Sequence, residues 1–562
     1  MVTCMRFILL FALFSGLFQV SQASTDSLII KGRILNLNGR LYRQASFINF
    51  SRNNILQPQS ELSKQAPLEP DGSFRVSLPM IFTQEEIYLD YGGKAFTTFL
   101  GSPGTVEITF NGDSLNTTGK LFYFAGVNAD ANNQYPLYIQ EENKRLSANK
   151  ALGSEFFKSF WERSAAQARS LAEQRAALRT GAVQAASLNS VPSPALLQWV
   201  KSNAEEEQMQ ILFEHSLSNL YEISDALKDS LNRLAKPPLT GQRVIWASRF
   251  GDYADLLVQQ QRINSPTRTN SLPVRLMATL IRTYSNTLTP DDKQRLEQIT
   301  LNGVAEKAQL DFLNKLFAKN ETTLNILFNY ERESRSYNDL FDSTATEFLN
   351  ARYLSRNLYK FTYKQQLLLN RHIQSRNGIP QFRQSLDELV RLEVKDSADI
   401  SKLANFKNAR TLPTEALPGY YLTASNDRGN TWVNQILDSY KGSTIYLVKW
   451  SMEDAKSREE LGFIPMLQSR LPENVKFLFV HLPGQEYGFS DELLRQYLVR
   501  HQLKGTHVFL SDNQAMDLLF RLNPLDAGTF AIIRPNGKFA LKNAPAPSAL
   551  DKTVKAILDA NK

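Results

Sequence analysis

Cysteine is almost absent from this chain of 562 residues, which contains a single one, Cys4. A dithiol–disulfide cycle needs two thiols, because one attacks the substrate disulfide and the other resolves the mixed disulfide. A disulfide within the chain also needs two cysteines. The composition therefore excludes an internal dithiol catalyst, a cysteine-rich zinc site and stabilisation by internal disulfides, so the fold must be held by burial alone.

Long apolar runs are equally scarce, and the clearest one lies at the start of the chain. Arg6 precedes an apolar stretch at residues 7–18, and residues 21–23 (Ser-Gln-Ala) have the small-x-small pattern of a signal-peptidase site. The stretch is too short for a membrane anchor, which needs roughly 20 apolar residues. We predict that residues 1–23 form a cleaved signal peptide that carries Cys4 away. The mature protein is then cysteine-free, has no transmembrane segment, and is most simply periplasmic.

Motifs for several other chemistries are missing as well. The chain has five histidines, His215, His372, His481, His501 and His507, and none forms a pair at zinc-helix spacing. There is no phosphate-binding glycine loop, dinucleotide fingerprint or serine-hydrolase elbow. The net charge of +8 is spread over the chain without a basic run interleaved with aromatics. We therefore predict no metal, no cofactor and no nucleic-acid partner, and we interpret His481, at the end of a predicted strand, as structural.

Residues 24–118 show the period-2 alternation of apolar and polar side chains that is typical of β-strands. The predicted strands are 28–34, 45–50, 72–78, 86–91 and 105–110. Turn signals stand at residues 70–72 (Pro-Asp-Gly) and 102–104 (Ser-Pro-Gly). This pattern predicts a small antiparallel β-sandwich. It is similar to the β-domain that precedes thioredoxin domains in exported proteins of Bacteroidota-type bacteria.

Residues 119–410 change to the spacing of amphipathic helices and predict an α-helical middle region. Helix starts are indicated by Ser193-Pro194 and by residues 289–292 (Thr-Pro-Asp-Asp), which combine a cap residue with proline in the first turn. Three consecutive acids, residues 205–207, are interpreted as a solvated helix face. Pro413 and Pro418 mark a linker to the last part of the chain.

Residues 411–562 alternate predicted strands and helices. The strands are predicted at 443–450, 475–482, 506–510, 529–534 and 538–541, and residues 534–538 form a tight turn. Strands separated by a helix pair in parallel, whereas a tight turn joins antiparallel strands. The fold class is therefore multidomain, with an all-β sandwich, an α-helical middle and a C-terminal α/β domain of thioredoxin-like arrangement.

The last part resembles TlpA-like thiol-disulfide oxidoreductases of the Bacteroidota envelope. The resemblance rests on residues 440–442 (Tyr-Lys-Gly) before the first strand and on residues 528–538. The family pattern Trp-x-x-x-Cys-x-x-Cys-Arg-x-Glu then falls on Trp450, Arg458 and Glu460. It implies that the two cysteine positions of the family are Asp454 and Ser457 here.

A second register is also open, because anchoring the pattern on Pro465 places Ser457 and Glu460 at the cysteine positions. Neither register supplies a thiol. Aspartate is among the preferred residues before a helix, so Asp454 is expected to be an N-cap rather than a catalyst. The position of the family's cis-proline holds Gly528, and a trans peptide bond is expected there.

The resemblance also indicates where a partner could bind. Trp450, Ala527, Gly528 and Thr529 surround the former redox site and are the candidate binding residues; the alternative is that the helical region covers this surface. We expect a redox-inactive pseudoenzyme that acts as a binding or assembly module for a protein or peptide in the cell envelope. The alternative is a TlpA-like oxidoreductase, or another enzyme with a noncanonical site.

Overall fold

A computed structural model describes residues 27–115, 120–158, 160–186, 191–219, 223–264, 272–303, 306–395, 397–407, 410–426, 428–483, 491–522 and 528–561. These residues divide into two compact units. Unit 1 contains the described residues up to Arg356 together with Leu369–Asp387, and unit 2 contains Asn357–Leu368 and the described residues from Glu388 onward. Each unit therefore combines two separate stretches of the chain. Cys4 and the rest of residues 1–23 lie outside the described residues.

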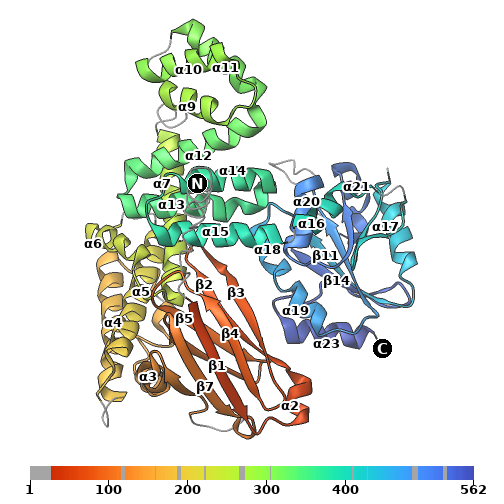
Figure 1. Ribbon diagram of the computed structural model, residues 1–562. Helices are drawn as coiled ribbons and strands as arrows, with labels where there is room; N and C mark the ends of the chain where they lie inside the picture. The colour runs from red at the N-terminus through yellow and green to blue at the C-terminus, as the bar shows by residue number, and fades with distance from the viewer. Residues whose placement is uncertain are drawn as a thin grey trace, which may run out of the picture. The chain divides into compact units, whose positions relative to one another are not determined.

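Unit 1 begins with a β-sandwich of two four-stranded sheets (Figure 1). Its strands are β1 (Ser27–Leu35), β2 (Phe47–Asn54), β3 (Gln57–Pro67), β4 (Ser73–Pro79), β5 (Glu85–Tyr91), β6 (Ala95–Gly101), β7 (Gly104–Asn111) and β8 (Tyr123–Gly126). The strand orders are β4-β1-β7-β8 and β3-β2-β5-β6. The predicted sandwich is confirmed, but β3, β6 and β8 were not predicted. The expected purely antiparallel pairing is wrong, because β1 and β7 run parallel.

The inner faces of the two sheets form one continuous apolar core. Ile30 and Ile108 on one sheet and Phe50 and Ile87 on the other are fully buried and belong to the same cluster. The predicted turn at residues 70–72 is present, since Gly72 adopts φ +82° and its amide donates to the carbonyl of Glu69 at 2.9 Å. A β-branched residue would be strained at that backbone angle.

Helices complete unit 1. They are α3 (Ala129–Ala148), α4 (Ala165–Ala186), α5 (Pro194–Asn219), α6 (Asp225–Asp229), α7 (Gly241–Asn264), α9 (Val274–Tyr284), α10 (Pro290–Asn302), α11 (Lys307–Lys319), α12 (Glu321–Leu340), α13 (Ser343–Asn357), and parts of α14 (Tyr363–Gln374) and α15 (Pro380–Lys395). Both predicted helix starts are confirmed. Ser193 Oγ accepts the Leu196 amide at 3.1 Å, and Thr289 forms a capping box with Asp292.

The expectation that residues 205–207 are a solvated helix face is wrong. Glu206 is 0% exposed and forms an ion pair with Arg243 of α7. Glu207 is bonded to Arg175 and Arg179 of α4, each at 3.0 Å. A run of acids does not reveal this burial, because the compensating arginines stand some 30 or more residues away in the chain.

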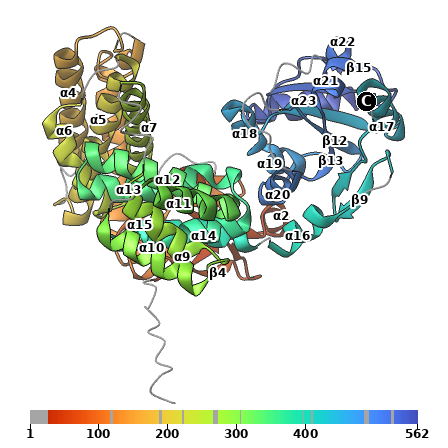
Figure 2. The ribbon, with the colours of Figure 1, turned by 90° about the horizontal axis from the view of Figure 1, so that it is seen from above.

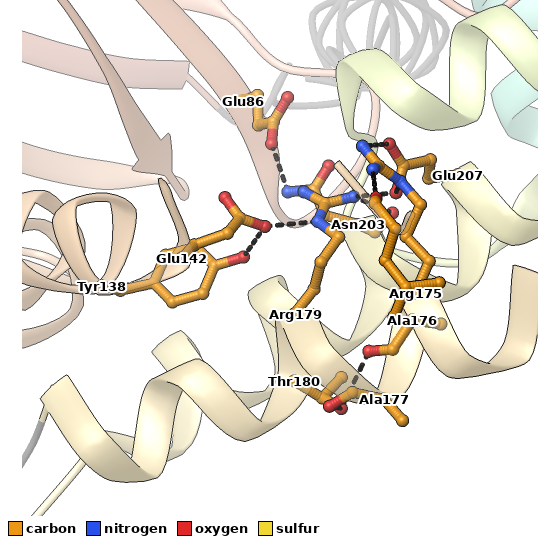
Figure 3. Close-up of polar contacts among 11 residues, drawn as sticks. Glu86, Tyr138, Glu142, Arg175, Ala176, Ala177, Arg179, Thr180, Asn203 and Glu207 are labelled. Atoms are coloured by element: carbon orange, nitrogen blue, oxygen red, sulfur yellow. Dashed lines mark hydrogen bonds and ion pairs between the residues drawn. The ribbon is translucent and has the colours of Figure 1, made fainter. Parts of the chain in front are cut away.

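A buried polar network joins the sandwich to the helices of unit 1 (Figure 3). Glu86 on β5 accepts hydrogen bonds from Trp199 Nε1 at 2.6 Å, Asn203 Nδ2 at 2.7 Å and the Gly241 amide at 2.6 Å. These donors belong to α5 and α7. Because a buried carboxylate is stable only when it is fully hydrogen-bonded, this contact fixes where the two helices pack on the sheet.

We predict that Glu86→Ala lowers the free energy of unfolding of unit 1 by roughly 3 kcal/mol or more, because three buried donors lose their acceptor. The control is Glu107→Ala, which removes a half-exposed ion pair to Lys31 and is expected to cost less than about 1 kcal/mol. Hydrogen exchange of peptides from β5 and α5 in the full chain measures both changes. Equal protection in the two variants would contradict the role assigned to Glu86.

Unit 2 is an α/β domain with one seven-stranded sheet. Its elements are α16 (Ser397–Asn405), β9 (Thr414–Leu417), β10 (Tyr420–Leu422), α17 (Gly429–Ser439), β11 (Thr444–Trp450), α18 (Ala455–Leu461), α19 (Ile464–Ser469), β12 (Val475–His481), α20 (Asp491–Arg500), β13 (Gly505–Phe509), α21 (Asp512–Asp517), α22 (Leu519–Leu522), β14 (Thr529–Ile533), β15 (Phe539–Leu541) and α23 (Leu550–Ala560). The strand order is β15-β14-β11-β12-β13-β10-β9.

The thioredoxin-like arrangement is confirmed by this sheet. β11, β12 and β13 are parallel, and the antiparallel pair β14 and β15 flanks β11. Helices cover both faces, with α18, α19, α20 and α23 on one side and α17 and α21 on the other (Figures 1 and 2). The segment marked by Pro413 and Pro418, predicted as a linker, instead contains the edge strand β9, which pairs with the next strand β10.

Candidate functional site

The site predicted around Asp454 and Ser457 lies where β11 ends and α18 begins. Asp454 is the N-cap of α18, and its Oδ2 accepts the Ser457 amide at 2.7 Å, which confirms the predicted cap. Ser457 is 1% exposed, and its Oγ accepts the Ser451 amide at 3.1 Å. Both side chains thus satisfy backbone groups at the strand–helix junction.

Gly528, the residue directly before the neighbouring strand β14, faces this junction. Its amide donates to the Lys449 carbonyl at 3.0 Å, and its φ is +69°. A Cβ at Gly528 would lie 3.4 Å from Asp454 Oδ2 and 3.7 Å from the Ser457 Cα. Asp454 and Ser457 are therefore the pair opposite the family's proline position, which favours the first register.

The remaining binding candidates differ in accessibility. Gly528 and Thr529 are half-buried, and Thr529 pairs with Lys449. Trp450 is only 1% exposed, so a partner could reach it only after a local rearrangement. Ala527, and with it the expected trans peptide bond to Gly528, lies outside the described residues.

Trp450 packs within an aromatic cluster at the carboxyl ends of the parallel strands. Its ring centroid lies 4.7 Å from that of His481 and 5.5 Å from that of Tyr497. Within the described residues, neither Trp450 Nε1 nor His481 Nε2 has a hydrogen-bond partner. Burial lowers the pKa of His481 to about 4, so its ring is neutral at neutral pH. This supports a structural role for His481.

The other two residues that match the family pattern also make structural contacts. The Arg458 guanidinium donates to the Met452 carbonyl at 2.5 Å and lies 4.4 Å above the ring of Tyr359, which belongs to the Asn357–Leu368 stretch of unit 2. Glu460 accepts the amide and the hydroxyl of Ser548 at 2.9 and 2.8 Å. The carboxylate that the second register would place at a cysteine position is thus already hydrogen-bonded.

The arrangement of Asp454 and Ser457 determines the chemistry available. Thiol exchange requires a thiolate at the helix start and a second thiol beside it. Here a carboxylate caps the helix, and a buried hydroxyl accepts a backbone hydrogen bond. Neither group can form a mixed disulfide, so the site has the geometry of a thioredoxin-like junction without its chemistry.

Comparison with known proteins adds one finding. No family model and no curated protein matches the chain. Among solved structures, part of the chain is similar to the solution structure of a Bacteroides vulgatus protein provisionally described as a thiol-disulfide oxidoreductase. The identity is 22%, the match covers 22% of this chain and 76% of that one, and the TM-score is 0.18. The thioredoxin-like arrangement of unit 2 therefore rests on its own strand order.

A groove in unit 1 is a second candidate, which the sequence did not indicate. It encloses about 460 Å³ between α4 and α5. Its lining combines small and apolar side chains with polar and charged ones: Ala176, Ala177, Thr180, Val183, Leu197 and Val200, together with Glu173, Gln184, Lys201, Glu205 and Gln208. Figure 3 shows three of these residues on α4, the helix that also carries Arg175 and Arg179. The Thr180 hydroxyl donates back to the Ala176 carbonyl at 3.0 Å, and the lining carries charges of both signs, so the groove does not select one class of ligand.

Within the described residues, no group of three or more His, Cys, Asp or Glu side chains is placed to hold a metal ion. In that same part of the chain, no helix combines the length and apolar character needed to cross a membrane.

We predict that Asp454→Ala destabilises the start of α18 by roughly 1 kcal/mol, as for other lost N-caps. Asp454→Asn is the matched control, since asparagine caps helices about as well and keeps the hydrogen bond to the Ser457 amide. Hydrogen exchange at that amide measures the loss. If both variants exchange like the wild type, Asp454 is not the cap that holds this helix end.

We further predict that unit 2 loses stability in acid. Burial lowers the pKa of His507 to about 3 and that of His481 to about 4, both below the ordinary value of 6.5. Between these pKa values and pH 6.5, the two histidines bind protons in the unfolded chain but stay neutral in the folded unit. The part of the free energy of unfolding that these two histidines contribute is fully present above about pH 6.5. It is lost as the pH falls toward 4 and below.

Hydrogen exchange of unit 2 peptides between pH 7 and pH 4, corrected for the intrinsic exchange rate, checks this. His481→Phe keeps a ring against Trp450 without a titrating group, so its pH dependence should be shallower. An identical slope in wild type and His481→Phe would contradict the assignment to this residue.

Proposed function

We propose that this chain is an exported, redox-inactive thioredoxin-fold protein that serves as a binding or assembly module in the cell envelope, most simply in the periplasm. The observation that carries the proposal is the replacement of the dithiol. Asp454 caps α18 and Ser457 is buried beneath it, so the two positions now stabilise the junction. The signal-like start of the sequence supports export.

The binding surface proposed for a protein or peptide partner is the backbone around Gly528 and Thr529. In thioredoxin-like proteins, an extended segment pairs with the main chain beside the cis-proline position, and such pairing needs no thiol. Gly528 adds no side chain there and remains half-exposed. Asp454 Oδ2 lies at the edge of the same notch, so a partner segment with a donor or a positive charge is favoured.

The proposal is tested by thiol exchange, with insulin as the disulfide substrate and dithiothreitol as the reductant. We expect the purified chain without residues 1–23 to show no catalysed exchange. The positive control is the double variant Asp454→Cys and Ser457→Cys. Cα atoms three residues apart at a helix start lie roughly 5 Å from each other, which is within the Cα–Cα range of a disulfide.

In that control, we expect mass spectrometry to show an internal disulfide after oxidation and the insulin assay to show weak activity. Asp454→Cys alone should show neither. Activity of the cysteine-free protein that survives repurification would overturn the proposal in favour of a TlpA-like oxidoreductase or another enzyme. Free thiols in an oxidised double variant would contradict the placement of Asp454 and Ser457 at the dithiol positions.

A further inference from the structure

A carboxylate, an imidazole and a phenol form a continuous hydrogen-bonded chain in unit 1. Glu331 lies in α12, His372 near the end of α14, and Tyr284 is the last residue of α9. His372 Nε2 is 2.6 Å from Glu331 Oε1, and His372 Nδ1 is 2.8 Å from the Tyr284 hydroxyl. Glu331 and His372 are 2% and 4% exposed, whereas Tyr284 is half-buried. Three helices thus place an acid, a base and an oxidisable side chain in series.

The partners of His372 determine its tautomer. Burial alone would raise the pKa of Glu331, but the hydrogen bond from His372 and the charge of Arg376 outweigh it, so the pKa is lowered and the group is ionised. An ionised carboxylate only accepts, so His372 Nε2 must carry a proton. With Nε2 bonded to the carboxylate, Nδ1 is the ring nitrogen that faces Tyr284, and in the singly protonated ring it accepts the Tyr284 O–H.

The surroundings of Tyr284 prevent simple ionisation of its phenol. Burial, reinforced by Glu331 and opposed by Arg376 and Arg371, raises its pKa above the ordinary value. The phenolate is therefore not populated at neutral pH. An electron can leave this ring at low energy only if the hydroxyl proton leaves with it, and His372 Nδ1 is the base in hydrogen-bond reach.

We propose that Tyr284 is a proton-coupled redox site whose reaction partners are one-electron oxidants such as soluble metal complexes or small radicals. The oxidant gains one electron, the Tyr284 O–H bond breaks, and the proton forms an N–H bond at His372 Nδ1. The products are a neutral tyrosyl radical, the reduced oxidant and an imidazolium held by the Glu331 carboxylate. A one-electron reductant reverses the step. The proposal does not depend on the function proposed for unit 2.

Other accessible tyrosines lack this arrangement. Tyr123 is 58% exposed, but the Lys120 ammonium lies 4.8 Å above its ring, which opposes the loss of an electron. Tyr42 is 37% exposed and serves as a matched comparison for Tyr284. Both rings are more exposed than Tyr284, and within the described residues neither hydroxyl is hydrogen-bonded to an imidazole, so we expect them to react more slowly than Tyr284.

The test uses the full chain and hexachloroiridate(IV) as the one-electron oxidant. Stopped-flow absorbance follows the reduction of the oxidant, freeze-quench electron paramagnetic resonance identifies the radical, and peptide mapping locates the product. We expect a fast phase that ends in a tyrosyl radical at Tyr284 and is slower in D2O. Tyr284→Phe should remove this phase, and Tyr42→Phe should leave it unchanged.

His372→Gln separates the base from the fold, because a glutamine amide can still donate to Glu331 but offers no base to Tyr284. We expect it to slow the fast phase by roughly 100-fold, the lower end for removal of a positioned base. An unchanged rate in folded His372→Gln would overturn the proposal. So would a radical confined to tryptophan, or equal oxidation of Tyr42 and Tyr284. If His372→Gln does not fold, the wild-type rate in D2O decides, since the absence of an isotope effect excludes proton-coupled oxidation.

Discussion

The hydrogen bond from the Ser457 amide to Asp454 is the interaction on which the properties of unit 2 depend. In a thioredoxin-like fold the first turn of this helix lies beside the ends of the central strands, and its free amides favour an anion. A redox protein places a thiolate there. This chain places a permanent carboxylate, which satisfies the helix end directly. The same geometry that would activate a thiol therefore stabilises the junction, and Ser457 is buried there with its hydroxyl bonded to the Ser451 amide.

Because the chain has only one cysteine, no internal disulfide can stabilise unit 1. Buried ion pairs and hydrogen bonds instead act together with the apolar core. Arg179 forms ion pairs with both Glu142 and Glu207, and Glu86 accepts hydrogen bonds from donors on two helices. Such pairs are weak evidence of net stability, since each charge must be removed from water. Their larger effect is to favour one arrangement of the helices on the sandwich over others. A helix placed wrongly on the sandwich would leave Glu86 or Glu206 buried without a partner, which costs more than the correct contact gains.

Local patterns predicted much of this fold. The strands β11, β12 and β14 are buried on both faces and appear in the sequence as continuous apolar runs. The helix starts at Ser193 and Thr289 were also predictable, because capping depends on residues within one turn. Edge strands were missed where they are short or polar. β10 has three residues, and β9 carries exposed Glu415, so neither shows clear alternation.

The candidate site shows the same division between local and distant information. That Asp454 caps a helix could be read from adjacent residues. That Gly528 faces it, that Tyr359 covers Arg458 and that Ser548 binds Glu460 depends on segments some 70 to 100 residues apart in the chain. Glu331, His372 and Tyr284 are likewise separated by more than 40 residues from one another. Each is unremarkable in its own helix. Their significance arises only from packing, because a histidine nitrogen bonded to an ionised carboxylate must carry a proton, which leaves the other nitrogen to face the tyrosine.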